Sequence, residues 1–196
     1  MEEKILNEEA SLELISQMIR NTRRKLEDGN GISFLVWGYT TFVISLAVYF
    51  FIKTTGDYHY NFLWFLTPVL GSIGMSIFKR NKTKHGGHAM NFIDRTIRNI
   101  WMVIGIAAFL TSVGASFVRF PILSVMLLLL GIGTALTGLT IKFKLVVISG
   151  FIGMLSCVVP FFINGYEQIL VFGVICLIMM VIPGHILNYQ GRRKNV

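Results

Sequence analysis

Six charge-free apolar runs constrain this chain more than any other feature of its sequence. Each run is 17 to 22 residues long and contains no Asp, Glu, Lys, Arg, Asn or Gln; they cover 32–52, 62–78, 100–118, 120–141, 145–163 and 169–187. A bilayer core is crossed by about 20 helical residues. Because backbone polar groups in lipid must pair within their own segment, we expect each run to be helical. The sequence therefore predicts an all-α membrane protein with six transmembrane helices.

Composition excludes the ordinary soluble classes. Charged residues make up 14% of the 196-residue chain and apolar residues 54%, whereas soluble domains carry about 25% charged residues. This chain lacks the polar surface that a globule of its size needs in water. An ordinary soluble enzyme and a disordered chain are both excluded.

The distribution of basic residues predicts the orientation in the membrane. Of the 18 Lys and Arg residues, only Lys53 and Arg119 fall on one side of the six predicted spans. Basic residues collect on the cytoplasmic side of membrane proteins. We therefore expect both termini in the cytoplasm, and we attribute the net charge of +8 to topology rather than to nucleic-acid binding. Short connections between the spans predict antiparallel hairpins.

The chain divides into three parts. Residues 1–31 are expected to form a cytosolic amphipathic helix and a linker, 32–188 the transmembrane domain, and 189–196 a basic cytosolic tail. The first helix is expected to begin near Asn7 and to end at Gly29 or Gly31, since glycine commonly follows a helix.

One face of this amino-terminal helix is predicted to be a binding surface. Apolar residues recur at helical spacing and basic residues follow in its second half; the surface comprises Leu12, Ile15, Ile19, Arg20, Arg23, Arg24 and Lys25. An amphipathic helix must cover its apolar face. We expect it to pack on the cytosolic ends of the spans or in the headgroup layer, with docking of a cytosolic protein or a second copy as the alternative.

One cluster has residue types that suit a metal ion. His85, His88 and Asp94 lie in the longest cytosolic connection, and two histidines with a carboxylate are legitimate zinc ligands. Two glycines between the histidines oppose a helix that would fix both imidazoles, which favours a basic loop near phospholipid headgroups. We expect no cofactor, and a membrane enzyme using this loop is the minor alternative to a non-enzymatic protein.

Small residues in the fourth run predict close helix packing. Gly131, Ala135 and Gly138 recur at the spacing that lets helix backbones approach. We expect this face to pack inside a single six-helix bundle, and a homodimer through the fourth span is the alternative.

The two cysteines are expected to lie at one depth in the bundle. Cys157 and Cys176 fall near the middle of the fifth and sixth runs, which a short loop connects. Cysteine in an apolar helix behaves as a small packing residue. We expect both thiols to be reduced.

Two functions from different classes fit these features. The first is a non-enzymatic multi-pass protein that acts through its cytosolic face, by binding a partner or by sensing the membrane. The second is a small permease or channel subunit for a neutral or apolar solute, which would require a cavity edged by Thr40, Thr41, Thr67, Thr111 and Thr134. No acidic residue lies inside a predicted span, which argues against proton-coupled transport.

Four segments of the chain resemble an uncharacterised family of small six-span integral membrane proteins of Bacteroides-type bacteria. The segments are 11–19, 34–39, 137–144 and 182–188, with the sequences SLELISQMI, FLVWGY, TGLTIKFK and IPGHILN. The resemblance implies residence in a bacterial cytoplasmic membrane, as a multi-pass protein. It implies no activity and no functional residue.

The charge distribution generates a topology prediction. A membrane-impermeant thiol reagent should label Asp57→Cys or Gly165→Cys in intact cells, because both positions lie on the side with two basic residues. Lys82→Cys and Asn195→Cys should be labelled only after the membrane is opened. Labelling of this second pair in sealed cells would reverse the predicted orientation.

Overall fold

The computed structural model describes residues 8–83, 92–118 and 120–193, without the side chains of residues 8–12, 14–30, 79, 81–83, 92 and 191–193. These residues form helices and no strand, which confirms the all-α prediction. In chain order the elements are α1 (Glu8–Thr55), the 3₁₀ helix η1 (Tyr58–Phe65), α2 (Leu66–Thr83), α3 (Phe92–Ala115), α4 (Ile122–Ile141), α5 (Lys144–Leu155), the 3₁₀ helix η2 (Ser156–Phe162) and α6 (Glu167–Arg193).

Six stretches of these helices are long and apolar enough to cross a membrane. They are Gly31–Thr55, Tyr58–Phe78, Ile93–Ala115, Ile122–Ile141, Lys144–Phe162 and Glu167–Gln190. Each overlaps one predicted run, so the number of membrane-length helices is confirmed. The fifth combines α5 with η2, where Pro160 supplies no backbone N–H and the helix tightens to the 3₁₀ form.

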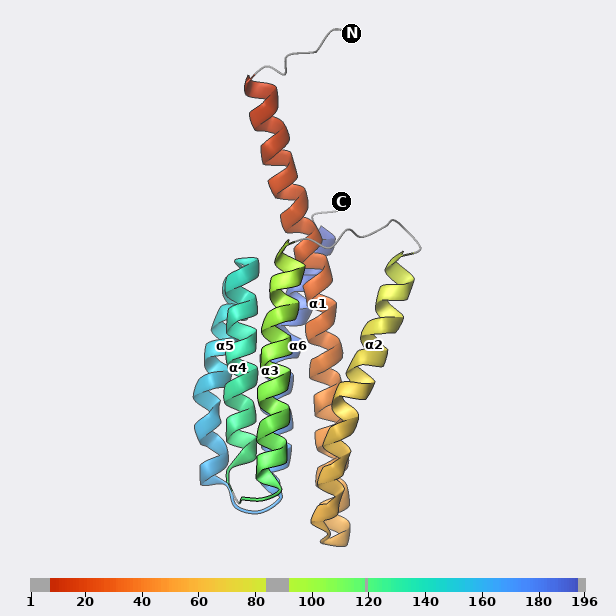
Figure 1. The fold of residues 1–196 in the computed structure, drawn as a ribbon, viewed down its shortest axis with the longest axis vertical. Helices are drawn as coiled ribbons and strands as arrows, with labels where there is room; N and C mark the ends of the chain where they lie inside the picture. Colours follow the sequence, from red (N-terminus) through yellow and green to blue (C-terminus); the bar gives the residue numbers. More distant parts are fainter. Residues whose placement is uncertain (1–7, 84–91, 119, 194–196) are drawn as a thin grey trace.

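The expected helix end at Gly29 or Gly31 is wrong, because α1 is continuous from Glu8 to Thr55. The predicted linker is therefore helical. Gly31 serves a different purpose: a Cβ built on it would lie 3.0 Å from the backbone nitrogen of Asn188 in α6. Its missing side chain allows a close helix contact, at a cost of about 1 kcal/mol in helix propensity. Figure 1 shows the amino-terminal part of α1 continuing past the ends of the other helices.

The first and last helices form the most extensive contact in the molecule. A Cβ on Gly38 of α1 would lie 2.8 Å from the side chain of Val181. Further along, the buried Ser45 hydroxyl donates a hydrogen bond to the Ile169 carbonyl at 2.5 Å. Small residues thus run along the whole α1–α6 contact and bring the two helices together.

The second extensive contact joins α4 to α5. Cβ atoms on Gly131 and Gly138 would each lie 2.6 Å from a backbone nitrogen of α5. From the other side, a Cβ on Gly150 would lie 2.4 Å from the backbone nitrogen of Ala135. These distances leave no room for side chains, so the two backbones touch.

Burial divides the helices into central and peripheral ones. In the membrane-length stretch of α6, half of the residues in its apolar part are buried. The corresponding share is 6% in the stretch that contains α2 and 6% in the stretch of α3. Helix α3 is attached mainly to α4, where the Trp101 indole N–H donates to the Thr137 hydroxyl at 3.1 Å. Helix α2 contacts mainly α1. By their contacts, α2 packs on α1, α1 on α6, α6 on the α4–α5 pair, and α3 on α4.

The two cysteines lie in one layer of the core, as predicted. Cys176 is buried with Leu127 and Phe172, and Cys157 packs against the same cluster. Both are free thiols.

The backbone contact between α4 and α5 can be tested with one methyl group. Gly150→Ala should lower the free energy of unfolding by about 1–3 kcal/mol, because the added Cβ meets the backbone of Ala135. Gly105→Ala is the matched control, since a Cβ there has nothing within 4 Å. It should be neutral or stabilising by up to about 1 kcal/mol. Unfolding of the purified protein in detergent measures both, and equal stability of the two variants would contradict the packing described.

Candidate functional site

The turn between α4 and α5 is held in an uncommon backbone conformation. Lys142 has φ 55°, and it is the one residue other than glycine with positive φ among those that the structure describes. Its N–H donates to the Leu139 carbonyl at 3.2 Å, and the N–H of Phe143 donates to the Gly138 carbonyl at 2.9 Å. These bonds satisfy the last carbonyls of α4. The Phe143 side chain packs against the hydrophobic core and fixes the turn.

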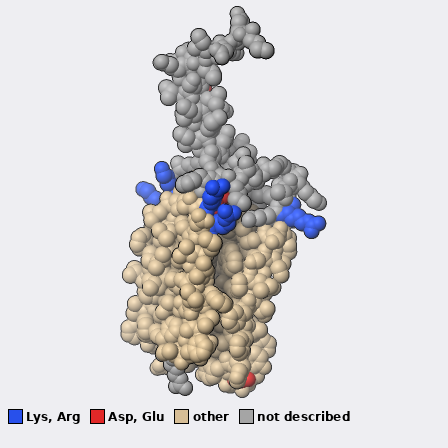
Figure 2. All heavy atoms as spheres, in the orientation of Figure 1, with Lys and Arg blue, Asp and Glu red and all other residues tan. Residues whose placement is uncertain are grey.

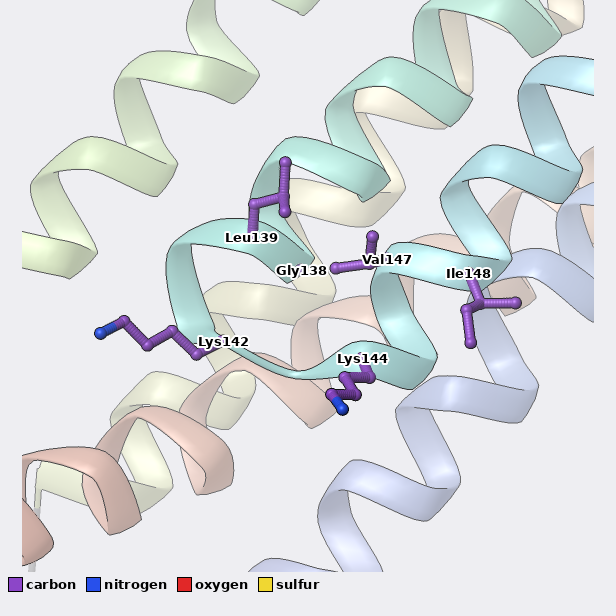
Figure 3. Close-up of a pocket in the computed structure, with 6 residues that line it drawn as sticks. All are labelled: Gly138, Leu139, Lys142, Lys144, Val147 and Ile148. Carbon is purple, nitrogen blue, oxygen red and sulfur yellow. The ribbon is translucent and has the colours of Figure 1, made fainter.

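A pocket of about 430 Å³ lies beside this turn. Its walls come from the last turn of α4 and the first turns of α5, and it is lined by Gly138, Leu139, Lys142, Lys144, Val147 and Ile148. In Figure 3 the side chain of Val147 points toward Gly138, and the two lysines extend outward from the turn. The pocket is therefore apolar along its walls and cationic at its end.

The electrostatics of the pocket favour an anion. Lys142 and Lys144 are both exposed. Within residues 8–83, 92–118 and 120–193, neither ammonium group has a carboxylate partner. The N-cap of α5, Phe143, provides no side-chain acceptor for the N–H groups of the first turn. Those N–H groups add a partial positive charge near the two lysines.

Basic side chains gather at this same end of the bundle. Figure 2 shows Lys and Arg around the end from which the amino-terminal part of α1 extends, while the flank below is free of charge on this face. Arg80 lies in the last turn of α2, Arg95 and Arg98 lie in the first turns of α3, and Lys142 and Lys144 flank the α4–α5 turn. At the opposite end, the Asp57 carboxylate accepts a bond from the His59 N–H at 2.9 Å, which holds the pKa of Asp57 below its usual range.

The small residues predicted in the fourth span all face α5 within this chain. Gly131, Ala135 and Gly138 are buried, and each lies at the α4–α5 contact. Gly138 also lines the pocket.

Several other predicted site residues lie outside the part that the structure describes. They are His85 and His88 and the side chains of Leu12, Ile15, Ile19, Arg20, Arg23, Arg24 and Lys25. Asp94 is described: it is half-buried in the first turn of α3 and has an interaction partner. Among the described residues, no group of three His, Cys, Asp or Glu side chains could hold a metal ion. The zinc hypothesis stays a prediction, because two of its ligands are not described.

The five threonines proposed to edge a solute cavity lie on four different helices. Thr41 and Thr134 are buried, and Thr40, Thr67 and Thr111 are half-buried. The Thr111 hydroxyl donates to the carbonyl of Ala107 in its own helix at 2.7 Å. Among the residues that the structure describes, the hydroxyls of Thr67 and Thr134, and that of Ser124, have no hydrogen-bond partner. None of these threonines lines the pocket at the α4–α5 turn.

A polar pair between α1 and α6 was not predicted as a unit. The Tyr39 hydroxyl and His185 Nε2 are hydrogen-bonded at 2.9 Å, and their rings meet edge to face with centroids 6.1 Å apart. Both side chains are exposed on the flank of the bundle. The sequence marks each as an isolated polar residue in an apolar run, but it does not indicate that α1 and α6 are neighbours.

No protein-family model, curated protein or solved structure matches this chain. Functional proposals therefore depend on its own residues and geometry.

The Tyr39–His185 bond can be measured by a double-mutant cycle. Tyr39→Phe and His185→Leu should show a coupling of about 0.5–1.5 kcal/mol in the free energy of unfolding, because each removes one partner of the same hydrogen bond. Tyr58→Phe, which alters an exposed tyrosine at the other end of α1, is the control and should change stability by a few tenths of a kcal/mol. If Tyr39→Phe is equally destabilising with and without His185, the two side chains do not interact.

Proposed function

We propose that this chain is a non-enzymatic multi-pass membrane protein that acts through its cytosolic face. The bundle flank supports the membrane assignment, since large apolar side chains such as Phe109, Leu110 and Phe151 are exposed there. In water such a surface would cause aggregation, whereas in a membrane it would contact the lipid acyl chains. Consecutive helices run in opposite directions in Figure 1, which supports the antiparallel hairpin arrangement.

The basic end of the bundle is proposed to face the cytoplasm. The described cations of α2, α3 and the α4–α5 turn gather there (Figure 2), and Lys53 lies at the other end, in the last turn of α1. This distribution agrees with the tendency of Lys and Arg to stay cytoplasmic. The resemblance of four segments to proteins of Bacteroides-type bacteria supports the bacterial cytoplasmic membrane as the location.

One observation favours action through this face. The part of α1 that is apolar enough to cross a membrane starts at Gly31, and α1 itself begins 23 residues earlier. That extension is helical, its sequence is amphipathic, and it lies at the basic end. The opposite end offers short turns between helices. We assign the interaction to the extension, with a cytosolic protein or the lipid headgroup layer as its partner.

A permease for a neutral solute is the rival. Three hydroxyls without partners support it, namely Thr67 on α2, Ser124 and Thr134 on α4. Against it, the helices of the two extensive contacts touch at their backbones, and Thr67 and Thr111 belong to the two helices with the least burial. Glycerol uptake by proteoliposomes discriminates the two: uptake that Thr134→Val abolishes would support the permease.

A homodimer through the fourth span would have to use a different face from the one expected. The small residues of α4 are covered by α5, whereas Leu128, Leu136 and Leu139 remain exposed. Such a leucine face is as stable in contact with lipid as in contact with another helix.

The proposed role of the amino-terminal helix can be tested by limited proteolysis. Ile15→Asp with Ile19→Asp should accelerate trypsin cleavage at Arg20, Arg23, Arg24 and Lys25 in inverted membrane vesicles, because two charges disrupt burial of the apolar face. Gln17→Asp with Asn21→Asp places the same charges on the opposite face and should leave the cleavage rate unchanged. Equal rates for the two double variants would mean that the apolar face contacts neither membrane nor partner.

A further inference from the structure

We propose that the pocket at the α4–α5 turn binds one anionic phospholipid. The two lysines would hold its phosphodiester, and the apolar walls would hold the upper part of an acyl chain. This inference rests on the proposed membrane placement, but it does not depend on which compartment the basic end faces.

The cationic end of the pocket supplies the headgroup contacts. Lys142 and Lys144 flank a turn of one intervening residue, and neither has a carboxylate partner in the described part of the chain. Ammonium groups form short charge-assisted hydrogen bonds with phosphate oxygens. Because none of the described residues that line the pocket is acidic, the positive headgroup of a zwitterionic lipid finds no counter-charge among them.

The walls of the pocket distinguish a lipid from a free phosphate. Leu139 is 57% exposed and Ile148 59% exposed, and the side chain of Val147 points toward Gly138. One turn further along the same helix faces, Leu136 and Ile152 are exposed as well. Inorganic phosphate would leave these apolar surfaces uncovered, whereas an acyl chain would cover them.

The local fold explains why the pocket has this form. Gly138 brings the α4 and α5 backbones into contact directly below the turn, so the lysines and the apolar walls belong to one continuous surface. A volume of about 430 Å³ falls in the range of small-molecule pockets, roughly 300–1,000 Å³. Lysine stems can lie along the apolar wall while their ammonium groups reach the phosphate level.

Lipid binding to the purified full-length chain in neutral detergent tests the proposal. Native mass spectrometry should show one retained phosphatidylglycerol with an affinity at least about tenfold above that for phosphatidylcholine. Lys142→Gln with Lys144→Gln should weaken phosphatidylglycerol binding about tenfold and abolish the preference for phosphatidylglycerol over phosphatidylcholine. Lys53→Gln with Arg95→Gln removes the same charge away from the pocket and should retain the wild-type preference. Equal losses in the two double variants would overturn the proposal.

The acyl-chain contact is tested separately. Ile148→Trp should weaken phosphatidylglycerol binding by filling the apolar wall, although both lysines remain. Soluble glycerol 3-phosphate should compete poorly; if it competes as well as the lipid, the site is a phosphate site and the lipid assignment is wrong. Unfolding midpoints in lipid-free detergent confirm that every variant is folded.

The outcomes separate this proposal from the proposed function. Failure to retain phosphatidylglycerol would remove the lipid site and leave the role of the amino-terminal helix intact. Unchanged proteolysis of the Ile15 and Ile19 variant would remove that role and leave the lipid site intact.

Discussion

Close approach of helix backbones is the interaction on which this bundle depends. Moving an apolar side chain from lipid into a protein interior contributes little free energy. Helices in a membrane therefore associate mainly through van der Waals packing of complementary surfaces. At the α1–α6 and α4–α5 contacts, glycines such as Gly31 and Gly150 face the backbone of the neighbouring helix. At the α1–α2 contact, Gly71 faces the ring of Trp37 instead, which keeps the two backbones further apart. The low burial of α2 agrees with this difference.

Close approach of two helix backbones at a glycine also shapes the candidate site. Gly138 holds α4 against α5 up to the point where the chain reverses, and the reversal needs the left-handed conformation of Lys142. A residue other than glycine is disfavoured in that conformation by about 1–2 kcal/mol. Core packing of Phe143 and the two carbonyl contacts of the turn offset this cost. The turn thereby places two exposed lysines at the end of an apolar pocket.

Charge-free runs predict the six membrane-length helices because length and polarity are local properties. The continuity of α1 could not be predicted in this way, since a glycine that ends a helix and a glycine that packs one look alike in sequence. The pairing of α1 with α6 was also hidden, because apolar helices carry no polar face to indicate their neighbours. The sequence identified three packing residues of α4, namely Gly131, Ala135 and Gly138, but it did not indicate that they pack against α5. Lys142 and Lys144 entered only as topological charges, and the pocket beside them depends on tertiary contact between α4 and α5.

The pairing of the first helix with the last has a consequence for biogenesis. The ribosome synthesises α1 long before α6, so the glycine face of α1 has no partner helix while the residues between them are being synthesised. During that interval the Ser45 hydroxyl lacks the Ile169 carbonyl that it bonds in the finished bundle. The four α-helices between them are synthesised before the largest contact of the fold can form. The α1–α6 contact therefore forms only after all the helices between α1 and α6 have been synthesised.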